Sequence, residues 1–454
     1  MKMFLSAQWE RLQTSYWFVP SLLAVCATAL SFFTVHLDTI MKAKWIKATG
    51  WIWAGGPEGA RNVLATIAGS TITGAGVVFS ITIVSLTLAS SQFGPRLLRN
   101  FMADRATQFV LGVFVATFLY CLLVLRTIRG TDAATFVPYI SVTCGLLFAV
   151  GSVGFLIFFI HHVSSSILAE NLIARVAEDL QDGIERLFPE KVGEEAEAAE
   201  TPPEVSTHSW REEDAHEIHA ERSGFIQAMG SDRVLEIARE NDLLVRLYRR
   251  PGDFVAEGSL LVEVWPKAKA SVKLSGELRA TFLLGRHRTP TQDLEYSIDQ
   301  LVEVAVRALS PGINDPFTAM TCIEWLGVAL LQVSGRKIPS AQRFDDDGKL
   351  RVIADVTDFA GIAAACLNQI RQYGSASVAV TIRLLDMLER VASEIRSAEQ
   401  RAVLAEHARK IRDDGVSHAT NEQDQREIEE LFASAEKAWT SEPERRGGTR
   451  GLPA

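Results

Sequence analysis

Six polar side chains lie near the two ends of one predicted helix, residues 294–309, and could together bind a ligand: Arg286, Arg288, Asp293, Arg307, Asn314 and Asp315. Guanidinium groups bind carboxylate or phosphate through paired hydrogen bonds, so a pocket built from these side chains would hold a small anionic ligand. A structural interpretation competes with this one. Asp315 before Pro316 is the pattern of a helix N-cap, and Ser310-Pro311-Gly312 is the pattern of a helix end. The sequence favours a helix-break-helix corner here and leaves the pocket as the alternative.

Hydroxyl side chains recur at helical spacing in a second set of positions: Thr66, Ser70, Thr73, Ser80 and Thr87. This spacing places them in one stripe along a helix. In membranes, small polar residues either pack one helix against another or line a water-filled path. Three glycines nearby would let another helix approach closely, namely Gly69, Gly74 and Gly76. We interpret the stripe first as helix packing, with a pore lining as the alternative.

Metal and cofactor motifs are weak in this chain. His208, His216 and His219 do not have the spacing of a zinc site, and the acidic run 345–348 lacks the later glutamate of a calcium-binding loop. The turn at residues 251–258 resembles the turn of barrel-sandwich domains related to biotinyl and lipoyl carriers. Lys267 and Lys269, however, do not have the sequence context of a carrier lysine. We therefore expect no metal and no cofactor.

Motifs of enzymes and of nucleic-acid-binding proteins are also missing from the sequence. It contains no phosphate-binding glycine loop, zinc protease motif, nucleophile elbow or thiol pair, so we do not expect an enzyme. The formal net charge is −9 and the basic residues are scattered, which argues against nucleic acid as a partner.

The elements that must position these residues begin with four apolar stretches, at residues 16–37, 63–91, 109–125 and 138–160. A helix needs roughly 20 apolar residues to cross the hydrocarbon core, and each stretch is long enough or nearly so. Helices are expected because an unpaired backbone group in lipid is costly. The lipid bilayer is therefore the first expected partner.

Changes of pattern divide the chain into six predicted segments. They are a four-helix transmembrane domain (1–165), a helical stalk (166–188), an acidic flexible linker (189–222), a small mixed α/β module (223–285), a helical cytoplasmic domain (286–440) and a disordered tail (441–454). The expected fold class is mainly α, with a four-helix transmembrane domain followed by an α+β domain made of the β module and a helical bundle. The stalk has an apolar stripe that must be buried against the chain's own soluble domain or the same stalk of another subunit, so we expect a homo-oligomer.

Several of these segments together resemble a known family. The resemblance rests on the Ser/Thr/Gly-rich second apolar stretch, its exit Gln92-Phe93-Gly94-Pro95-Arg96, the turn Pro251-Gly252-Asp253-Phe254-Val255, and the string from Ala308 to Ala319. The chain is identified on these motifs as a member of a family of predicted bacterial membrane proteins described as domain of unknown function 2254. The resemblance spans nearly the whole chain and implies a bacterial inner-membrane protein. It implies no activity.

Two functions remain open at this stage. In the first, the protein is an oligomeric ion channel or transporter whose second span lines the path and whose cytoplasmic domain regulates it. In the second, it is a membrane-anchored ligand sensor or scaffold without transport activity. An even number of spans puts both termini on one side of the membrane, and Cys322 and Cys366 do not suggest a disulfide framework, so we expect both termini in the cytoplasm.

Overall fold

The computed structural model describes residues 16–40, 56–94, 104–131, 134–166, 168–189 and 214–440. The chain divides into two compact units, Met1–Asn171 and Leu172–Ala454. It is mainly helical, with several apolar helices and a small sheet region, as the sequence predicts. The predicted tail and most of the predicted linker lie outside the described residues. The finer division into six segments stays a prediction.

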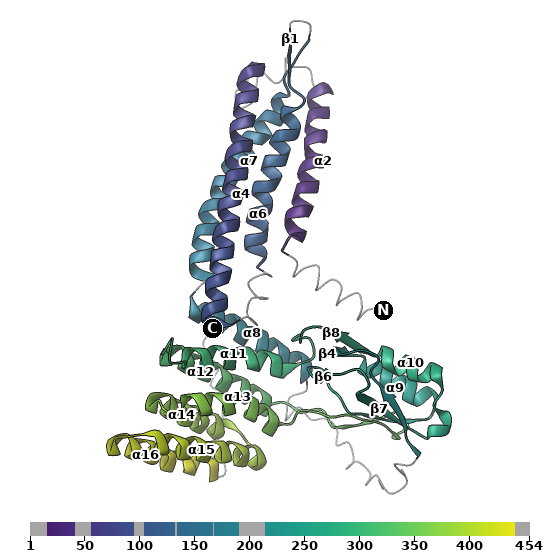
Figure 1. Ribbon diagram of the computed structural model, residues 1–454, viewed down its shortest axis with the longest axis vertical. Coiled ribbons are helices and arrows are strands. Elements are labelled where there is room, and N and C mark those ends of the chain that lie inside the picture. Colours follow the sequence, from purple (N-terminus) through teal and green to yellow (C-terminus); the bar gives the residue numbers. More distant parts are fainter. Residues whose placement is uncertain are drawn as a thin grey trace, which may run out of the picture. The chain divides into compact units, whose positions relative to one another are not determined.

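The described residues of the first unit include four long helices: α2 (Phe18–Ile40), α4 (Pro57–Phe93), α6 (Arg105–Leu125) and α7 (Tyr139–Ser166). Figure 1 shows them side by side, with a short hairpin of β1 (Arg129–Thr131) and β2 (Ala134–Phe136) between α6 and α7. α6 packs against the other three helices. α4 starts earlier than its apolar stretch because Pro57 suits a first helical turn and Glu58 complements the helix dipole.

Five described helices are long and apolar enough to cross a membrane: α2, α4, α6, α7 and α12 (Pro316–Ser334). The first four lie in the first unit and coincide with the four predicted spans, whereas α12 lies in the second unit. Length and composition alone therefore do not confirm the count of four. With 37 residues, α4 is about 55 Å long, which exceeds the ~30 Å hydrocarbon core.

Buried polar contacts join three of these helices. Asp38, near the end of α2, accepts hydrogen bonds from the backbone N–H groups of Ile140 (2.9 Å) and Ser141 (3.0 Å) and from the Ser141 hydroxyl (2.7 Å). It thus caps the first turn of α7 from a different helix. The Tyr120 hydroxyl of α6 lies 2.9 Å from Thr34 Oγ1 and 3.2 Å from the Ser141 carbonyl oxygen. These contacts satisfy polar groups that would be costly in lipid.

The second unit contains two small sheets. The strands are β3 (His216–His219), β4 (Gly224–Met229), β5 (Leu244–Leu247), β6 (Phe254–Val255), β7 (Leu260–Trp265), β8 (Phe282–Gly285), β9 (Gln342–Phe344) and β10 (Leu350–Ile353). One sheet has the order β3-β7-β5-β10-β9 and the other β6-β4-β8. Short helices α9 (Ser231–Glu240) and α10 (Val272–Ala280) and the 3₁₀ turn η4 (Lys267–Lys269) complete this part.

Strands β9 and β10 were not predicted from the sequence. Only the exposed acidic turn between them was expected, and the structure confirms a turn there, with Gly348 at φ 73°. β10 pairs in parallel with β5, which lies about a hundred residues earlier in the chain. Strands of three or four residues need a partner of this kind, because a short isolated hairpin is barely stable in water.

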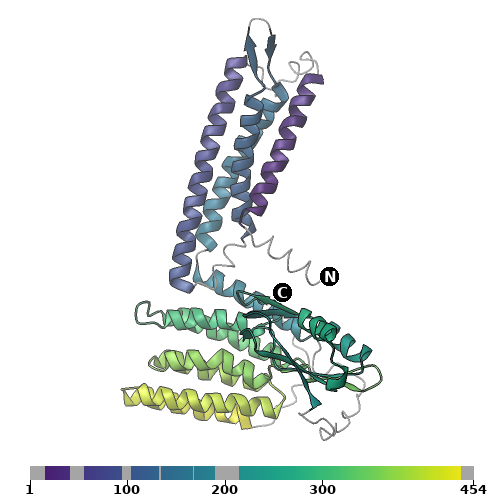
Figure 2. The same ribbon diagram turned by 45° about the vertical axis from the view of Figure 1, so that its right-hand side comes forward.

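Seven further helices belong to the part of the second unit that the structure describes. They are α8 (Ala169–Leu187), α11 (Leu294–Ala308), α12, α13 (Phe359–Gly374), α14 (Val378–Glu394), α15 (Ala398–His418) and α16 (Glu422–Thr440). Figures 1 and 2 show α11–α12, α13–α14 and α15–α16 as three stacked pairs. The predicted corner before α12 is confirmed: Asp315 accepts hydrogen bonds from the Thr318 N–H (3.2 Å) and hydroxyl (2.6 Å), and Pro316 stands in the first turn.

Helix α8 covers most of the segment predicted as a stalk. Its apolar stripe is buried within the chain itself, at Leu172, Val176, Leu180 and Ile184. Arg336 holds its end by donating to the Phe188 carbonyl oxygen (2.8 Å) and pairing with Glu185 (3.0 Å). The sequence left two possibilities for burying this stripe, and in the structure it is buried within the chain's own second unit.

Candidate functional site

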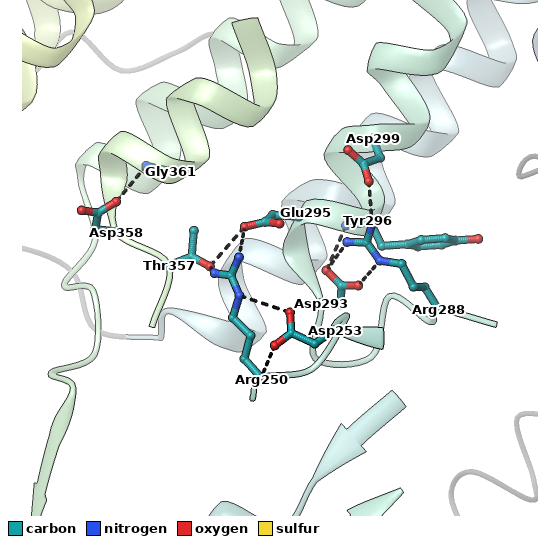
Figure 3. Close-up of polar contacts among 10 residues, drawn as sticks. All are labelled: Arg250, Asp253, Arg288, Asp293, Glu295, Tyr296, Asp299, Thr357, Asp358 and Gly361. Atoms are coloured by element: carbon teal, nitrogen blue, oxygen red, sulfur yellow. Dashed lines mark hydrogen bonds and ion pairs between the residues drawn. The ribbon is translucent and has the colours of Figure 1, made fainter. Parts of the chain in front are cut away.

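A cluster of charged side chains in the second unit lies where α11 begins. Figure 3 shows side chains from three segments meeting there: the turn after β5, the first residues of α11 with the loop before them, and the loop that leads into α13. We call it the ionic cluster and define it by six residues, Arg250, Asp253, Arg288, Asp293, Glu295 and Asp299.

Arg288 forms one half of the ionic cluster. Its guanidinium group donates two hydrogen bonds to the Asp293 carboxylate (2.7 and 2.9 Å) and one to Asp299 (2.7 Å). Asp293 is 4% exposed, and it also caps α11 by accepting from the Tyr296 N–H at 3.1 Å. Burial opposes the charge of Arg288, but the two carboxylates outweigh burial and raise the pKa of Arg288 above its usual value. Arg288, Asp293 and Asp299 thus form one ion-pair network.

Arg250 forms the other half. Its side chain donates to Glu295 (2.8 Å) in the first turn of α11 and to the hydroxyl of Thr357 in the loop before α13. Its backbone N–H donates to Asp253 at 3.0 Å. Arg250 therefore ties the turn after β5 to the starts of two helices in one set of contacts (Figure 3).

Gly252 brings the two halves together. It has φ +100°, a conformation that favours glycine, and a Cβ at this position would lie 2.5 Å from the Asp293 carboxylate. The Pro251-Gly252-Asp253 turn was singled out in the sequence, but its contact with Asp293 could not be read there. The turn needs glycine both for its backbone and for this close approach.

The structure does not bring the six predicted pocket residues together. Arg288 and Asp293 are in contact, whereas Arg286 is exposed beside them. Arg307, Asn314 and Asp315 lie at the other end of α11, a helix of 15 residues and so about 22 Å long. Arg307 pairs with Glu303 one turn before it (3.4 Å). Asn314 is exposed with φ 51°, a turn conformation that asparagine tolerates.

The sequence did not point to three residues of the ionic cluster, Arg250, Glu295 and Asp299, or to Thr357, which accepts from Arg250. The only sequence signal was the position of Arg250 directly before the Pro-Gly-Asp turn. Four carboxylates face two guanidinium groups, so the cluster carries net negative charge. This balance favours a clamp between segments over a binding site for a small anion.

The hydroxyl stripe of α4 is the second candidate site. Thr66, Ser70, Thr73, Ser80 and Thr87 are all exposed, on the side of α4 opposite its buried residues. Each hydroxyl donates to a carbonyl oxygen of its own helix three or four residues earlier, at 2.7–3.0 Å. Hydroxyls bonded in this way need no water or partner to be satisfied. The stripe therefore lies on the outer surface of the first unit.

The three glycines near the stripe separate into two groups. A Cβ on Gly74 would lie 2.7 Å from the Phe114 ring, so α6 already occupies the space beside this glycine. Gly69 and Gly76 have nothing within 4 Å of a Cβ. The close helix approach predicted from these glycines is thus found within the chain at Gly74, and the other two lie open on the outer surface.

Among the residues that the structure describes, no group of three His, Cys, Asp or Glu side chains could hold a metal ion. His208 lies outside the described residues, and the His216 ring contacts Ser275 Oγ at 3.1 Å. The acidic turn is organised by the side chain of Arg351. Asp345 accepts from Arg351 Nε (2.6 Å) and from the N–H groups of Asp347 and Lys349. These contacts lower the pKa of the Asp345 carboxyl, with Arg351 as the largest cause.

Several helices that are apolar enough to cross a membrane, together with a mixed α/β part, are the features of a membrane protein. The chain belongs to the family described as predicted membrane protein (DUF2254), which it matches over residues 13–390. It is 33% identical over 358 residues to an uncharacterised protein of Mycobacterium bovis and to another of Mycobacterium tuberculosis, a match covering 78% of this chain and 67% of each relative. No solved structure matches.

Proposed function

We propose that the protein is an oligomeric ion channel or transporter of the bacterial inner membrane, in which α4 helices from several copies line the path. The observation that carries this proposal is the outward direction of the hydroxyl stripe. A path along these hydroxyls cannot lie inside one copy, because α6 and α7 pack against α4 and the buried residues of α4 lie on the side opposite the hydroxyls. The stripe can line a path only between copies.

The topology that goes with this proposal has four spans, α2, α4, α6 and α7, and both termini in the cytoplasm. We place α12 outside the membrane because α11 and α14 pack against it and because Glu324 lies midway along it. A carboxylate within a span is costly in lipid. The second unit would then regulate the path from the cytoplasm.

A membrane-anchored ligand sensor or scaffold is the second candidate function. It is favoured by the self-contained bonding of the stripe, since hydroxyls that already donate to their own helix require no water-filled path. It is also favoured by the ionic cluster, which stiffens the second unit as a binding or assembly module would need. A ligand that uses Arg286 would stabilise the protein against heat, and the Arg286→Ala variant would lose that stabilisation.

Ion flux into liposomes that contain the purified full-length chain tests the first proposal. Ser80→Leu adds bulk on the stripe and is expected to abolish flux, whereas Ala65→Leu adds bulk on an exposed position next to Thr66, about 100° away around the helix, and is expected to keep it. Both variants must reach the membrane at wild-type abundance. If the Ser80→Leu variant keeps its flux, or if the wild type shows no flux with several ions and at several pH values, the sensor or scaffold becomes the favoured function.

A further inference from the structure

Helix α12 has an exposed face that its own unit leaves uncovered. Seven large hydrophobic side chains are exposed among the described residues of the second unit: Phe254, Val272, Ile313, Phe317, Val328, Leu331 and Tyr373. Four of the seven lie on α12 or in the corner just before it. Phe317 is 77% exposed, Val328 39% and Leu331 38%. Exposed hydrophobic side chains that cluster in this way mark an interaction surface.

These side chains form one stripe along α12. Phe317, Thr321, Glu324, Val328 and Leu331 follow each other at steps of four, three, four and three residues, which keeps them on one side of a helix. α11 and α14 cover the other sides of α12. We call this stripe the α12 face.

Charged groups lie in the middle of the α12 face. Glu324 pairs with Arg383 (3.0 Å) and Arg390 (2.7 Å) of α14, and Asp386 of α14 lies 3.4 Å from Arg390. Two acidic and two basic groups make this centre electrically neutral, and their side chains are 36–52% exposed. A lipid surface would have to accept this charged centre together with the hydrophobic ends, which is costly. A protein surface with matching charges can cover the same centre without that cost.

We propose that the α12 face binds the α12 face of a second copy of this chain around a two-fold axis through Glu324. The face is self-complementary about that residue, since Phe317 precedes it by seven positions and Leu331 follows it by seven. An antiparallel pair therefore places Phe317 of each copy against Leu331 of the other. The neutral centre of each copy faces the same neutral centre, so that Glu324 of one copy meets Arg383 and Arg390 of the other. A contact of this kind closes after two copies.

This inference does not rest on transport, because a scaffold would use the same contact as a channel. It is also separate from the α4 stripe, which lies in the first unit. Loss of flux in Ser80→Leu leaves the α12 contact intact, and loss of the α12 contact says nothing about whether α4 lines a path. The two proposals therefore fail in different experiments.

Cysteine cross-linking of the full-length chain in lipid nanodiscs tests the antiparallel arrangement. Cys26 is exposed and is replaced by serine in every variant, whereas Cys322 and Cys366 are buried and stay. Phe317 lies about 10 Å from the proposed axis, so two Phe317 positions are about 20 Å apart across the pair. A disulfide needs Cα atoms within about 7 Å. Phe317→Cys alone and Leu331→Cys alone should stay monomeric on a non-reducing gel after oxidation, and the double variant should run as a dimer.

The same prediction holds when the two single variants, carrying different tags, are produced together, because the cross-link must join different copies. Cross-linking of Phe317→Cys to itself would overturn the antiparallel arrangement. Absence of any dimer would overturn the proposal altogether. Labelling of Leu331→Cys with a water-soluble maleimide then shows whether the α12 face is accessible. A shielded position 331 without a dimer would mean that the bilayer or the same copy covers the face, and this too would overturn the proposal.

A charge in the contact provides an independent measurement. Val328→Lys is expected to weaken dimerisation about tenfold or more, as hot-spot positions do, when mass photometry follows the dimer fraction against concentration. Val272→Lys is the matched control, because Val272 is 93% exposed on α10 and lies off the α12 face. Equal dimer fractions in both variants would contradict the proposal, and thermal unfolding of each variant shows that both are folded.

Discussion

The ionic cluster and the hydroxyl stripe of α4 are both rows of polar side chains, but they bond in opposite ways. The ionic cluster contains bonds between segments, since Arg250 of the turn after β5 bonds to Glu295 of α11 and to Thr357 in the loop before α13. In the stripe each hydroxyl bonds to its own helix. Polar groups that bond across segments hold the fold together, whereas self-bonded groups can be changed without unfolding it. The stripe is thus the region where substitutions report on function.

The largest loss of stability is expected from Asp293→Ala. The substitution removes the carboxylate that holds Arg288, leaves that guanidinium partly buried without its main partner, and removes the N-cap of α11. Breaking a buried ion pair in this way costs about 3–5 kcal/mol in free energy of unfolding. Thermal or denaturant unfolding of the full chain measures it. Arg286→Ala, an exposed neighbour, should change the same quantity by less than about 0.5 kcal/mol. Equal losses of unfolding free energy in Asp293→Ala and Arg286→Ala would contradict the interpretation of the ionic cluster as a clamp.

A smaller loss is expected from Gly252→Ala. The added Cβ meets the Asp293 carboxylate and the backbone has φ +100°, so the cost is about 1–3 kcal/mol. Gly276→Ala in α10 is the control, because nothing lies within 4 Å of a Cβ there and the helix should gain roughly 0.5–1 kcal/mol. If both variants shifted the unfolding midpoint in the same direction, the close approach of the turn to α11 would be refuted.

A pH effect should come from His407 in α15, which is buried and has no hydrogen-bond partner at Nδ1. Burial, followed by the positive charge of Lys410, lowers its pKa below the ordinary value of 6.5. Above pH 6.5 the ring is neutral in both folded and unfolded chains, so it does not affect stability. As the pH falls below 6.5 the unfolded chain takes up a proton first, and the folded state loses stability. Unfolding midpoints between pH 8 and pH 5 should fall less in His407→Gln than in the wild type, whereas His219→Gln, at an exposed histidine, should follow the wild type.

The smallest effect is expected on the stripe itself. Thr73→Val keeps the shape of the side chain and removes a hydroxyl that bonds only to the Gly69 carbonyl oxygen, so the stability of the first unit should change by less than about 0.5 kcal/mol. Ser141→Ala removes a hydroxyl that donates to buried Asp38, and should cost about 1–3 kcal/mol. Unfolding in detergent, followed by helix content, compares the two. A Thr73→Val loss as large as that of Ser141→Ala would mean that the stripe is part of a structural contact.

Much of the second unit could be predicted at the level of single elements. α12 begins where the predicted cap Asp315 and Pro316 stand, and the glycines at 252 and 258 have the positive φ values that their turn requires. Strands β9 and β10 could not be found, since a strand of three or four residues depends on its distant partner. The partner of Asp38 was equally hidden, because α7 lies about a hundred residues later in the chain.

The apolar helices, the cap of α12 and the spacing of the α4 hydroxyls could be read from the amino-acid sequence, because each depends on residues within a few turns of each other. Tertiary packing settles which side chains meet. It separated Arg288 and Asp293 from Arg307, Asn314 and Asp315, it turned the stripe of α4 outward, and it buried the stripe of α8 within its own chain. The physical reason is that periodicity fixes which residues share a face, whereas only packing against distant segments fixes what that face is in contact with.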